Sequence, residues 1–153
     1  MKQQLDALDL RLLKELQQDC TLSAALLAER CGTTESTAQR RRRRLADNGA
    51  IERQVAIIDR AKAGWPLTMI VNIRIEREGP NNTIELMQKI SQHSAVAQFY
   101  HVTGSTDYVA ILRGRTMADF EDFLEKVLGA DARFATQSNV VIRTMTERSE
   151  VPL

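Results

Sequence analysis

Residues 32–45 read GTTESTAQRRRRRL. The glycine that opens this stretch is typical of a helix end, and the two threonines after it offer a hydroxyl cap for a new helix. We predict that helix over residues 36–46, because an Asn-Gly pair follows at residues 48–49. The five adjacent arginines, residues 40–44, would then lie on a helix and present guanidinium groups around more than one of its faces.

A shorter helix is predicted immediately upstream, over residues 21–31, with apolar side chains near helical spacing. An earlier helix is indicated between Asp6 and Gln18, where leucines form one stripe. The leucines of that stripe are Leu5, Leu8, Leu12, Leu13 and Leu16. Three helices with a tight turn at Gly32 predict a helix-turn-helix unit of the winged type, which is a DNA-binding architecture.

In a helix-turn-helix the second helix enters the major groove, and basic residues around it contact the phosphates. The candidate DNA-binding residues are Thr34, Ser36, Thr37, Gln39, Arg40, Arg41, Arg43 and Arg44. Gln39 suits adenine and Arg40 suits guanine, although both also suit phosphate oxygens. A run of charges is often only a solvated face, but the helix-turn-helix context favours DNA binding here.

Arg42 departs from this pattern, because it falls on the side of the helix that carries Ala38 and Leu45. An isolated buried charge is costly. We therefore expect Arg42 either to reach solvent or to pair with a carboxylate of the first helix.

The size of the chain, 153 residues of which 43% are apolar, allows one ordinary domain or two small ones. Its net charge of +1 is unevenly distributed: residues 1–54 hold ten Lys/Arg against eight Asp/Glu, and the remainder holds eleven against twelve. So small an excess predicts that DNA affinity comes from the local arginine cluster, doubled by dimerisation.

Several other classes of protein are disfavoured. Cys20 and Cys31 lack the partners of a zinc site, so we expect reduced thiols, no metal and no cofactor. Neither a nucleophile with its base nor a working pair of carboxylates stands out, so no catalytic residue is expected. No apolar run approaches the roughly twenty residues of a membrane span. We expect a cytoplasmic protein with no membrane partner.

The hydrophobic period changes beyond residue 66. Residues 50–59 are expected to be extended, and Gly-Trp-Pro at residues 64–66 marks the entry to the next part of the chain. The predicted domains are a DNA-binding domain over residues 1–54, a linker over 55–66 and a second domain over 67–153.

The second domain is predicted to run strand, helix, strand, strand, helix, strand. The expected strands lie at residues 67–76 (closing at Gly79-Pro80), 96–102, 108–112 and 134–145, and the expected helices begin near Asn82 and Met117. This order predicts an α+β chain whose second domain is a ferredoxin-like βαββαβ fold with both helices on one face of an antiparallel sheet. The uncovered face predicts at least a dimer.

Along nearly its whole length the chain resembles the Lrp/AsnC, or feast/famine, family of regulators. The matching fragments are Leu5-Asp6-Ala7-Leu8-Asp9, Leu27-Ala28, Gly32, Arg41, Leu45, Gly49-Ala50-Ile51, Val102-Thr103-Gly104-Ser105-Thr106-Asp107-Tyr108 and Val151-Pro152-Leu153. The resemblance implies DNA binding by the first domain and a second domain for effector binding and oligomerisation. It also implies dimers that assemble into octamers, and transcription tuned by an amino acid bound between dimers.

The resemblance also implies an effector site at the hairpin of the second domain. Its candidate residues are Tyr100, Val102, Gly104, Ser105 and Asp107, with Thr136, Gln137 and Ser138 contributed by an adjacent chain. Asp107 could accept an ammonium group beside donors for a carboxylate, or could simply cap the turn. This chain departs from the family at Ser105, where an acidic residue is frequent, and at Arg42, where an apolar one is.

Two other functions remain open on the residues alone. A haem- or tetrapyrrole-modifying enzyme of the related fold, with a degenerate helix-turn-helix, would need His93 or His101 to act on its substrate, although both positions suit structural histidines. An RNA-binding sheet would need exposed aromatics, for which Phe99, Tyr100 and Tyr108 are the candidates. The leading hypothesis is a sequence-specific transcriptional regulator that responds to an amino acid or related metabolite and is not an enzyme.

Overall fold

The computed structural model describes residues 4–76, 82–129 and 134–153, and the chain divides into two compact units. The helical unit contains the residues up to Ile57 together with Thr146–Leu153, and the sheet unit contains Ile58–Met145. The C-terminal segment thus joins the helical unit, whereas the sequence predicted it in the second domain. Two hydrogen bonds hold it there: the Gln17 amide donates to the Val151 carbonyl (2.8 Å) and accepts from the Val151 N–H (3.1 Å).

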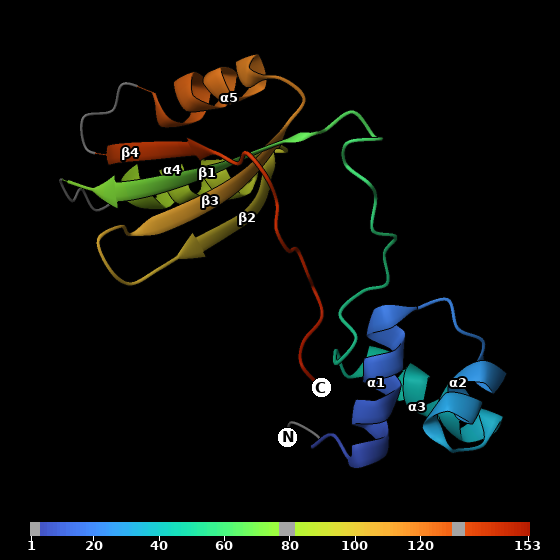
Figure 1. Ribbon diagram of the computed structural model, residues 1–153. Coiled ribbons are helices and arrows are strands. Elements are labelled where there is room, and N and C mark those ends of the chain that lie inside the picture. The colour runs from blue at the N-terminus through green and yellow to red at the C-terminus, as the bar shows by residue number, and fades with distance from the viewer. Residues whose placement is uncertain (1–3, 77–81, 130–133) are drawn as a thin grey trace. The chain divides into compact units, whose positions relative to one another are not determined.

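Three helices form the helical unit (Figure 1): α1 (Ala7–Gln18), α2 (Ala24–Cys31) and α3 (Glu35–Asp47). Each begins at a polar cap, which is Asp6 for α1, Ser23 for α2 and Thr34 for α3. Gly32 ends α2 at φ +65°, a left-handed conformation that favours glycine. The predicted helices are confirmed, and α2 begins later than residue 21 because Ser23 supplies its cap.

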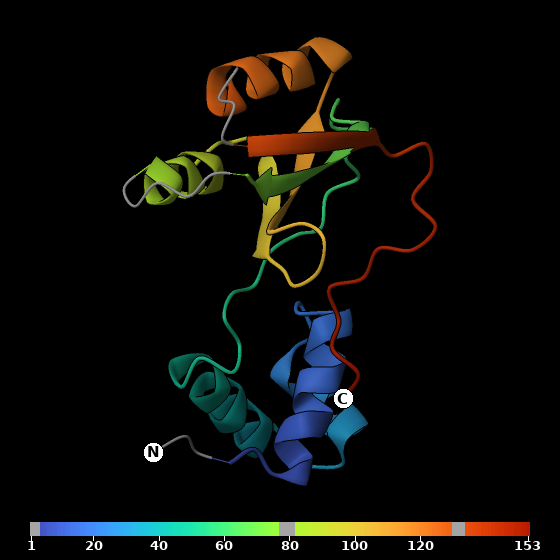
Figure 2. The ribbon, with the colours of Figure 1, turned by 90° about the vertical axis from the view of Figure 1, so that its left-hand side faces the viewer.

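The apolar faces of the three helices meet in one small core, and Figure 2 shows α3 beside α1. The buried members of this core are Leu12, Leu16, Leu22, Leu27, Ala28, Cys31, Ala38 and Leu45. The predicted leucine stripe of α1 and the buried side of α3 are therefore confirmed. Within residues 4–57 the structure has no strand, so the extended segment after α3 forms no wing there.

A four-stranded antiparallel sheet in the order β2-β3-β1-β4 forms the second unit. Its strands are β1 (Leu67–Ile75), β2 (Val96–His101), β3 (Tyr108–Gly114) and β4 (Phe134–Val140). Its helices are α4 (Asn82–Ser91) and α5 (Met117–Phe123), and α5 continues as a π-helical turn, η1 (Leu124–Leu128). This is the predicted βαββαβ order of a ferredoxin-like fold.

The last strand is shorter than predicted. Strand β4 ends at Val140, opposite Met69, and the next N–H donates to the Thr68 carbonyl. Because β1 itself begins at Leu67, its ladder offers no room for the predicted extension to residue 145, and Ile142 is fully exposed. The predicted turn at residues 79–80 lies outside the described residues.

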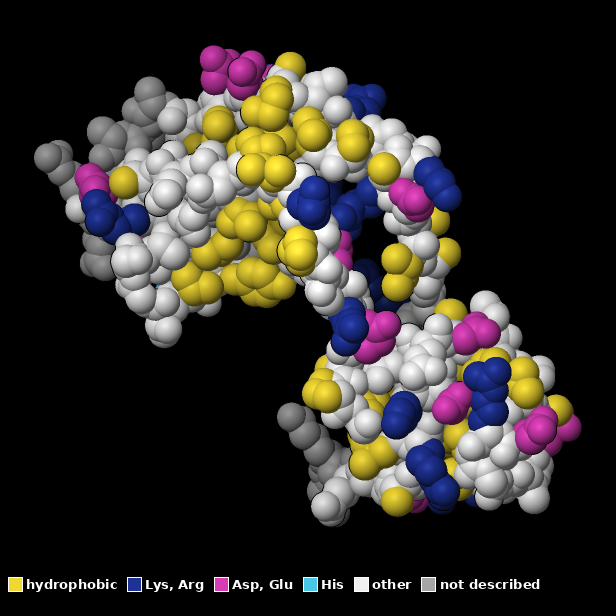
Figure 3. Space-filling view, in the orientation of Figure 1, with side chains coloured by type: hydrophobic (Ala, Val, Ile, Leu, Met, Phe, Trp, Pro, Cys, Tyr) yellow, Lys and Arg dark blue, Asp and Glu magenta, His cyan; other side chains and the backbone are white. Residues whose placement is uncertain are grey.

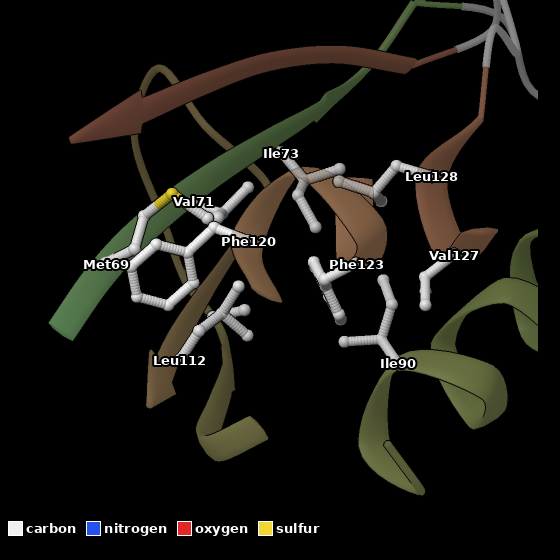
Figure 4. Packing of buried hydrophobic residues seen from close by; sticks show 10 residues of the cluster. Met69, Val71, Ile73, Ile90, Leu112, Phe120, Phe123, Val127 and Leu128 are labelled. Atoms are coloured by element: carbon white, nitrogen blue, oxygen red, sulfur yellow. The ribbon is translucent and has the colours of Figure 1, made fainter. Parts of the chain in front are cut away.

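Both helices of the sheet unit cover the same face of the sheet. Figure 4 shows their buried side chains meeting alternate residues of β1 and β3. The buried members are Met69, Val71, Ile73, Ile90, Ala110, Leu112, Phe120, Phe123, Val127 and Leu128. The packing is close enough that a Cβ added at Gly114 would stand 2.7 Å from the Phe120 ring, which accounts for a glycine at the end of β3.

The opposite face of the sheet has no helix over it among the described residues. The half-buried Ile70 and Ile111 are paired in the sheet register, Val109 lies beside them, and Tyr100 is 48% exposed. Figure 3 shows hydrophobic side chains gathered over β2 and β3. The predicted uncovered face is therefore present. No helix in the described part of the chain is long and apolar enough to cross a membrane.

Candidate functional site

The structure divides the arginine run of α3 into two groups. Arg40 and Arg43 are exposed, and the Arg43 side chain is 86% accessible. The nearest acid to Arg43 is Asp47, whose carboxylate stands 3.9 Å away. The other three arginines, 41, 42 and 44, are partly buried and hydrogen-bonded within the helical unit. The two groups therefore differ in what they can offer a ligand.

Arg41 and Arg44 converge on a buried carboxylate, that of Asp9 on α1. Asp9 is 1% exposed, and its two oxygens accept from Arg44 Nη2 at 2.6 Å each. Arg41 Nη1 donates to Asp9 Oδ1 (2.9 Å) and to Asp6 Oδ2 (2.5 Å). This hydrogen bond from Arg41 lowers the pKa of Asp6 to about 2, and the Asp9 backbone N–H adds to the effect. These ion pairs fix α3 against α1.

Arg42 binds backbone carbonyls instead of a carboxylate of the first helix, so that part of the sequence prediction is wrong. Its guanidinium donates to the carbonyls of Leu22 and Cys20, each at 2.9 Å, and to the Gln54 side chain at 3.3 Å. The Asp9 carboxylate of α1 is already occupied by Arg41 and Arg44, and that of Glu15 pairs with Arg30. Arg42 thereby satisfies two carbonyls of the segment between α1 and α2.

Three hydroxyl groups surround the N-terminus of α3. Thr34 Oγ1 accepts the Thr37 N–H (3.3 Å), donates to Thr37 Oγ1 (2.9 Å) and lies 3.3 Å from Ser36 Oγ. The side chains of Ser36, Gln39 and Arg40 follow it and are exposed. The arrangement places neutral donors and acceptors at the positive end of the helix dipole, with cations along the same helix.

In the sheet unit, the loop between β2 and β3 is attached to the end of β1. The Asp107 carboxylate accepts the Ile75 N–H (2.7 Å), and the Asp107 N–H donates to the Ile73 carbonyl (3.0 Å). The Thr106 hydroxyl donates to that same carbonyl (3.1 Å). Asp107 thus stabilises the loop by bonding to the adjacent strand as well as to its own hairpin.

Beside this loop lies a polar hollow of about 400 Å³. It is lined by Asn72, Arg74, Ser105, Thr106, Ala135, Thr136 and Gln137. Arg74 is half-exposed and pairs with Glu76 at 2.5 Å. A cation, two kinds of hydroxyl and two amides around one hollow can bind a small zwitterion.

Three predicted effector residues, Ser105, Thr136 and Gln137, lie in this hollow within one chain. The lining does not include the other five, which are Tyr100, Val102, Gly104, Asp107 and Ser138. Sequence reasoning missed Asn72 and Arg74. Their signal was the alternation of β1, which places both on the face opposite the buried Val71 and Ile73.

The two histidines have structural surroundings. His93 Nδ1 accepts the Ala95 N–H (3.2 Å), and its ring packs edge-on against Phe123 with centroids 5.0 Å apart. His101 stacks on Tyr108 at 4.7 Å. Across residues 4–76, 82–129 and 134–153, no three His, Cys, Asp or Glu side chains are grouped to hold a metal ion.

Two family models match the chain. Residues 5–46 match the AsnC-type helix-turn-helix domain, and residues 68–151 match the Lrp/AsnC ligand binding domain. The first match covers α1, α2 and the part of α3 that carries the arginine run, and the second covers the sheet from Thr68 onward with its hollow.

Individual proteins agree with these matches. The DNA-binding transcriptional activator DecR of Escherichia coli is 30% identical over 82% of this chain and 83% of its own length. An AsnC family transcriptional regulator from Agrobacterium tumefaciens superposes with a TM-score of 0.89 at 26% identity, over 97% of both chains. A transcriptional regulator from Neisseria meningitidis, in complex with L-Met, superposes with a TM-score of 0.90 at 23% identity, again over 97% of both chains.

Proposed function

The chain belongs to the Lrp/AsnC family of transcriptional regulators, and we propose that it binds double-stranded DNA through α3 and adjusts this binding in response to an amino acid or a related small metabolite. One observation carries the proposal. Gln39, Arg40 and Arg43 stand clear of the core on a helix whose position is fixed by buried ion pairs.

The DNA contacts follow from the chemistry of these side chains. Arg40 and Arg43 suit phosphates or the O6/N7 edge of guanine, and Gln39 suits the N6/N7 edge of adenine. The hydroxyls of Ser36 and Thr37 and the N–H groups at the start of α3 suit a phosphate oxygen. Thr34 holds this end of the helix together by capping it. The N-terminal half of α3 therefore enters the major groove.

The effector is proposed to occupy the hollow between β1, β4 and the β2–β3 loop. Arg74 would exchange Glu76 for the carboxylate of an amino acid, while Gln137 and the hydroxyls of Ser105 and Thr136 would accept from its ammonium group. The regulator from Neisseria meningitidis, which binds L-Met, supports an amino acid as the class of ligand. A thermal-shift screen against the twenty amino acids identifies which one binds.

Assembly is proposed to occur through the uncovered face of the sheet. Ile70, Val109 and Ile111 form an apolar strip there, and a two-fold axis would bury the same strip on both protomers. A dimer carries two copies of α3 and doubles the number of phosphate contacts. Further association into octamers is part of the same proposal, by analogy with the family.

A catalytic role is not proposed. The enzyme alternative depended on His93 or His101, and each ring packs against an aromatic neighbour in the sheet unit. The related proteins are transcriptional regulators. For the RNA alternative, Phe99 and Tyr108 are not free to stack on bases, because they stack on one another and pack against the core.

The effector part is tested by a thermal-shift screen of the whole chain against the twenty amino acids, since a ligand that binds only the folded form raises the melting midpoint. We expect at least one to raise it, and Arg74→Gln to abolish the rise. Lys62→Gln is the matched control, because Lys62 is an exposed cation of the same unit outside the hollow. If Arg74→Gln leaves the rise in melting midpoint intact, the ligand does not bind in this hollow.

A further inference from the structure

The buried carboxylate of Asp9 neutralises part of the arginine run. Its two oxygens carry three hydrogen bonds from two guanidinium groups, and Asp6 supplies a second carboxylate to Arg41. The Nε atoms of Arg41 and Arg44 are themselves buried, with no hydrogen-bond partner among the described residues. The Asp9 carboxylate and the burial of Nε thus hold both guanidinium groups against the core of the helical unit.

The exposed fractions separate the arginines in the same way. The Arg41 side chain is 19% exposed and that of Arg44 is 33% exposed, against 86% for Arg43. Residues three apart lie on neighbouring positions of one helix face, so Arg40 and Arg43 project together. Two carboxylates matched to two guanidinium groups leave this pair as the exposed cations of the run.

Resting on the proposed DNA binding by α3, we infer that Asp6 and Asp9 are positioning residues that withhold Arg41 and Arg44 from DNA. Arg40 and Arg43 then supply the phosphate contacts of the run. Nonspecific affinity rises with each phosphate neutralised, whereas base contacts carry the sequence information. Withholding two cations therefore limits the sequence-independent part of binding and leaves the contacts of Gln39 and Arg40 to decide between sequences.

The first test measures how affinity for a mixed-sequence duplex depends on salt. Each phosphate contact contributes about 0.9 to the slope of log K against log salt. Arg43→Gln should reduce the slope by about 0.9 per protomer bound. Arg41→Gln, in protein shown by circular dichroism to be folded, should leave the slope unchanged. An equal loss of slope in the two variants would overturn the inference.

The second test releases the withheld cations. Asp9→Asn should make the slope steeper by about 0.9 for each arginine freed, a gain of nonspecific affinity from a change at a buried residue. Asp6→Asn is the companion variant for the event that Asp9→Asn fails to fold, because asparagine caps a helix as well as aspartate does. Glu52→Gln is the control, since it removes an exposed carboxylate that has no arginine partner among the described contacts. A steepening no greater than that of Glu52→Gln would refute the inference.

A third readout needs no DNA and separates this inference from the proposed function. Phenylglyoxal modifies accessible guanidinium groups, and mass spectrometry locates them. In the wild-type chain we expect Arg40 and Arg43 to react and Arg41 and Arg44 to be protected, with the protection of Arg41 reduced in Asp6→Asn. Equal reactivity of the four would overturn the positioning role even if DNA binding is found. Absence of DNA binding with the expected reactivity would refute the function alone.

Discussion

The two units of the chain are stabilised in different ways. The core of the helical unit includes a carboxylate, that of Asp9, held by Arg41 and Arg44. In the described part of the sheet unit, the core cluster consists of apolar side chains and the buried polar residue is Thr68, which is uncharged; the sheet leaves a second apolar strip on its other face. Ion pairs are directional, so they fix how one helix is presented. Apolar packing is not directional, and it provides a platform on which other chains can assemble.

Loss of a buried aromatic side chain should destabilise the sheet unit and leave the helical unit unchanged. Phe123 is fully buried against α4 and β1, so Phe123→Ala should destabilise the unit by about 3–5 kcal/mol. Urea denaturation followed by circular dichroism should then show a sheet transition at lower urea than in the wild type. Ile142→Ala is the control, because Ile142 is fully exposed and its loss should change stability by less than about 0.5 kcal/mol. A shift of equal size in both variants would contradict this description of the core.

A second change tests the uncovered face. Ile111→Glu places a charge on the apolar strip without disturbing the buried core, and two such charges would face each other across a two-fold axis. We expect the dimer to dissociate at micromolar concentration in analytical ultracentrifugation, with DNA affinity reduced at least tenfold. An unchanged molecular mass would show that assembly, if any, uses another surface.

Removing the buried charge of Asp9 tests whether ion pairs stabilise the helical unit. Asp9→Asn leaves the partly buried Arg44 without an anion and Arg41 with Asp6 alone, which should cost roughly 1–3 kcal/mol of stability in the helical unit. Asp47→Asn is the control, because Asp47 is 71% exposed and 3.9 Å from its arginine. If both variants melt alike, the ion pairs contribute little and α3 is held by its apolar side alone.

The ion pair between Arg41 and Asp6 should make the stability of the helical unit depend slightly on pH in the acid range. Arg41 holds the pKa of Asp6 at about 2, below the ordinary value of 3.8. The stability that this pair contributes is complete above pH 3.8 and is lost as the pH falls towards 2. The difference in melting midpoint between the wild type and Asp6→Asn should therefore vanish over this range. A difference that persists at pH 2 would require another cause.

Much of the fold could be predicted from local patterns. The leucine stripe of α1, the cap at Thr34, the turn at Gly32 and the alternation of β1 all depend on neighbours in the sequence, and the structure confirms them. The predicted end of β4 at residue 145 was wrong, because the length of a strand depends on its partner. Strand β1 begins at Leu67, so β4 ends at Val140.

The candidate sites were harder to predict, because they depend on contacts between distant residues. The sequence distinguishes Arg42 within the run, but the difference between the exposed Arg40 and Arg43 and the paired Arg41 and Arg44 arises from Asp6 and Asp9, which lie more than thirty positions earlier. Asp9 on an otherwise leucine-rich stripe was the available signal for a buried acid. The hollow beside Arg74 likewise forms only because β1 pairs with β4, which is distant in the sequence.

The proposed function requires that the exposed arginines of α3 bind the phosphates of duplex DNA. Its most direct test is the salt dependence of binding to a mixed-sequence duplex, measured by fluorescence anisotropy for the wild-type chain and for Arg40→Gln/Arg43→Gln. We expect binding at low salt and a slope that falls by about 1.8 per protomer in the double variant. A wild-type chain that ignores duplex DNA at low salt, or a double variant with the wild-type slope, would contradict it.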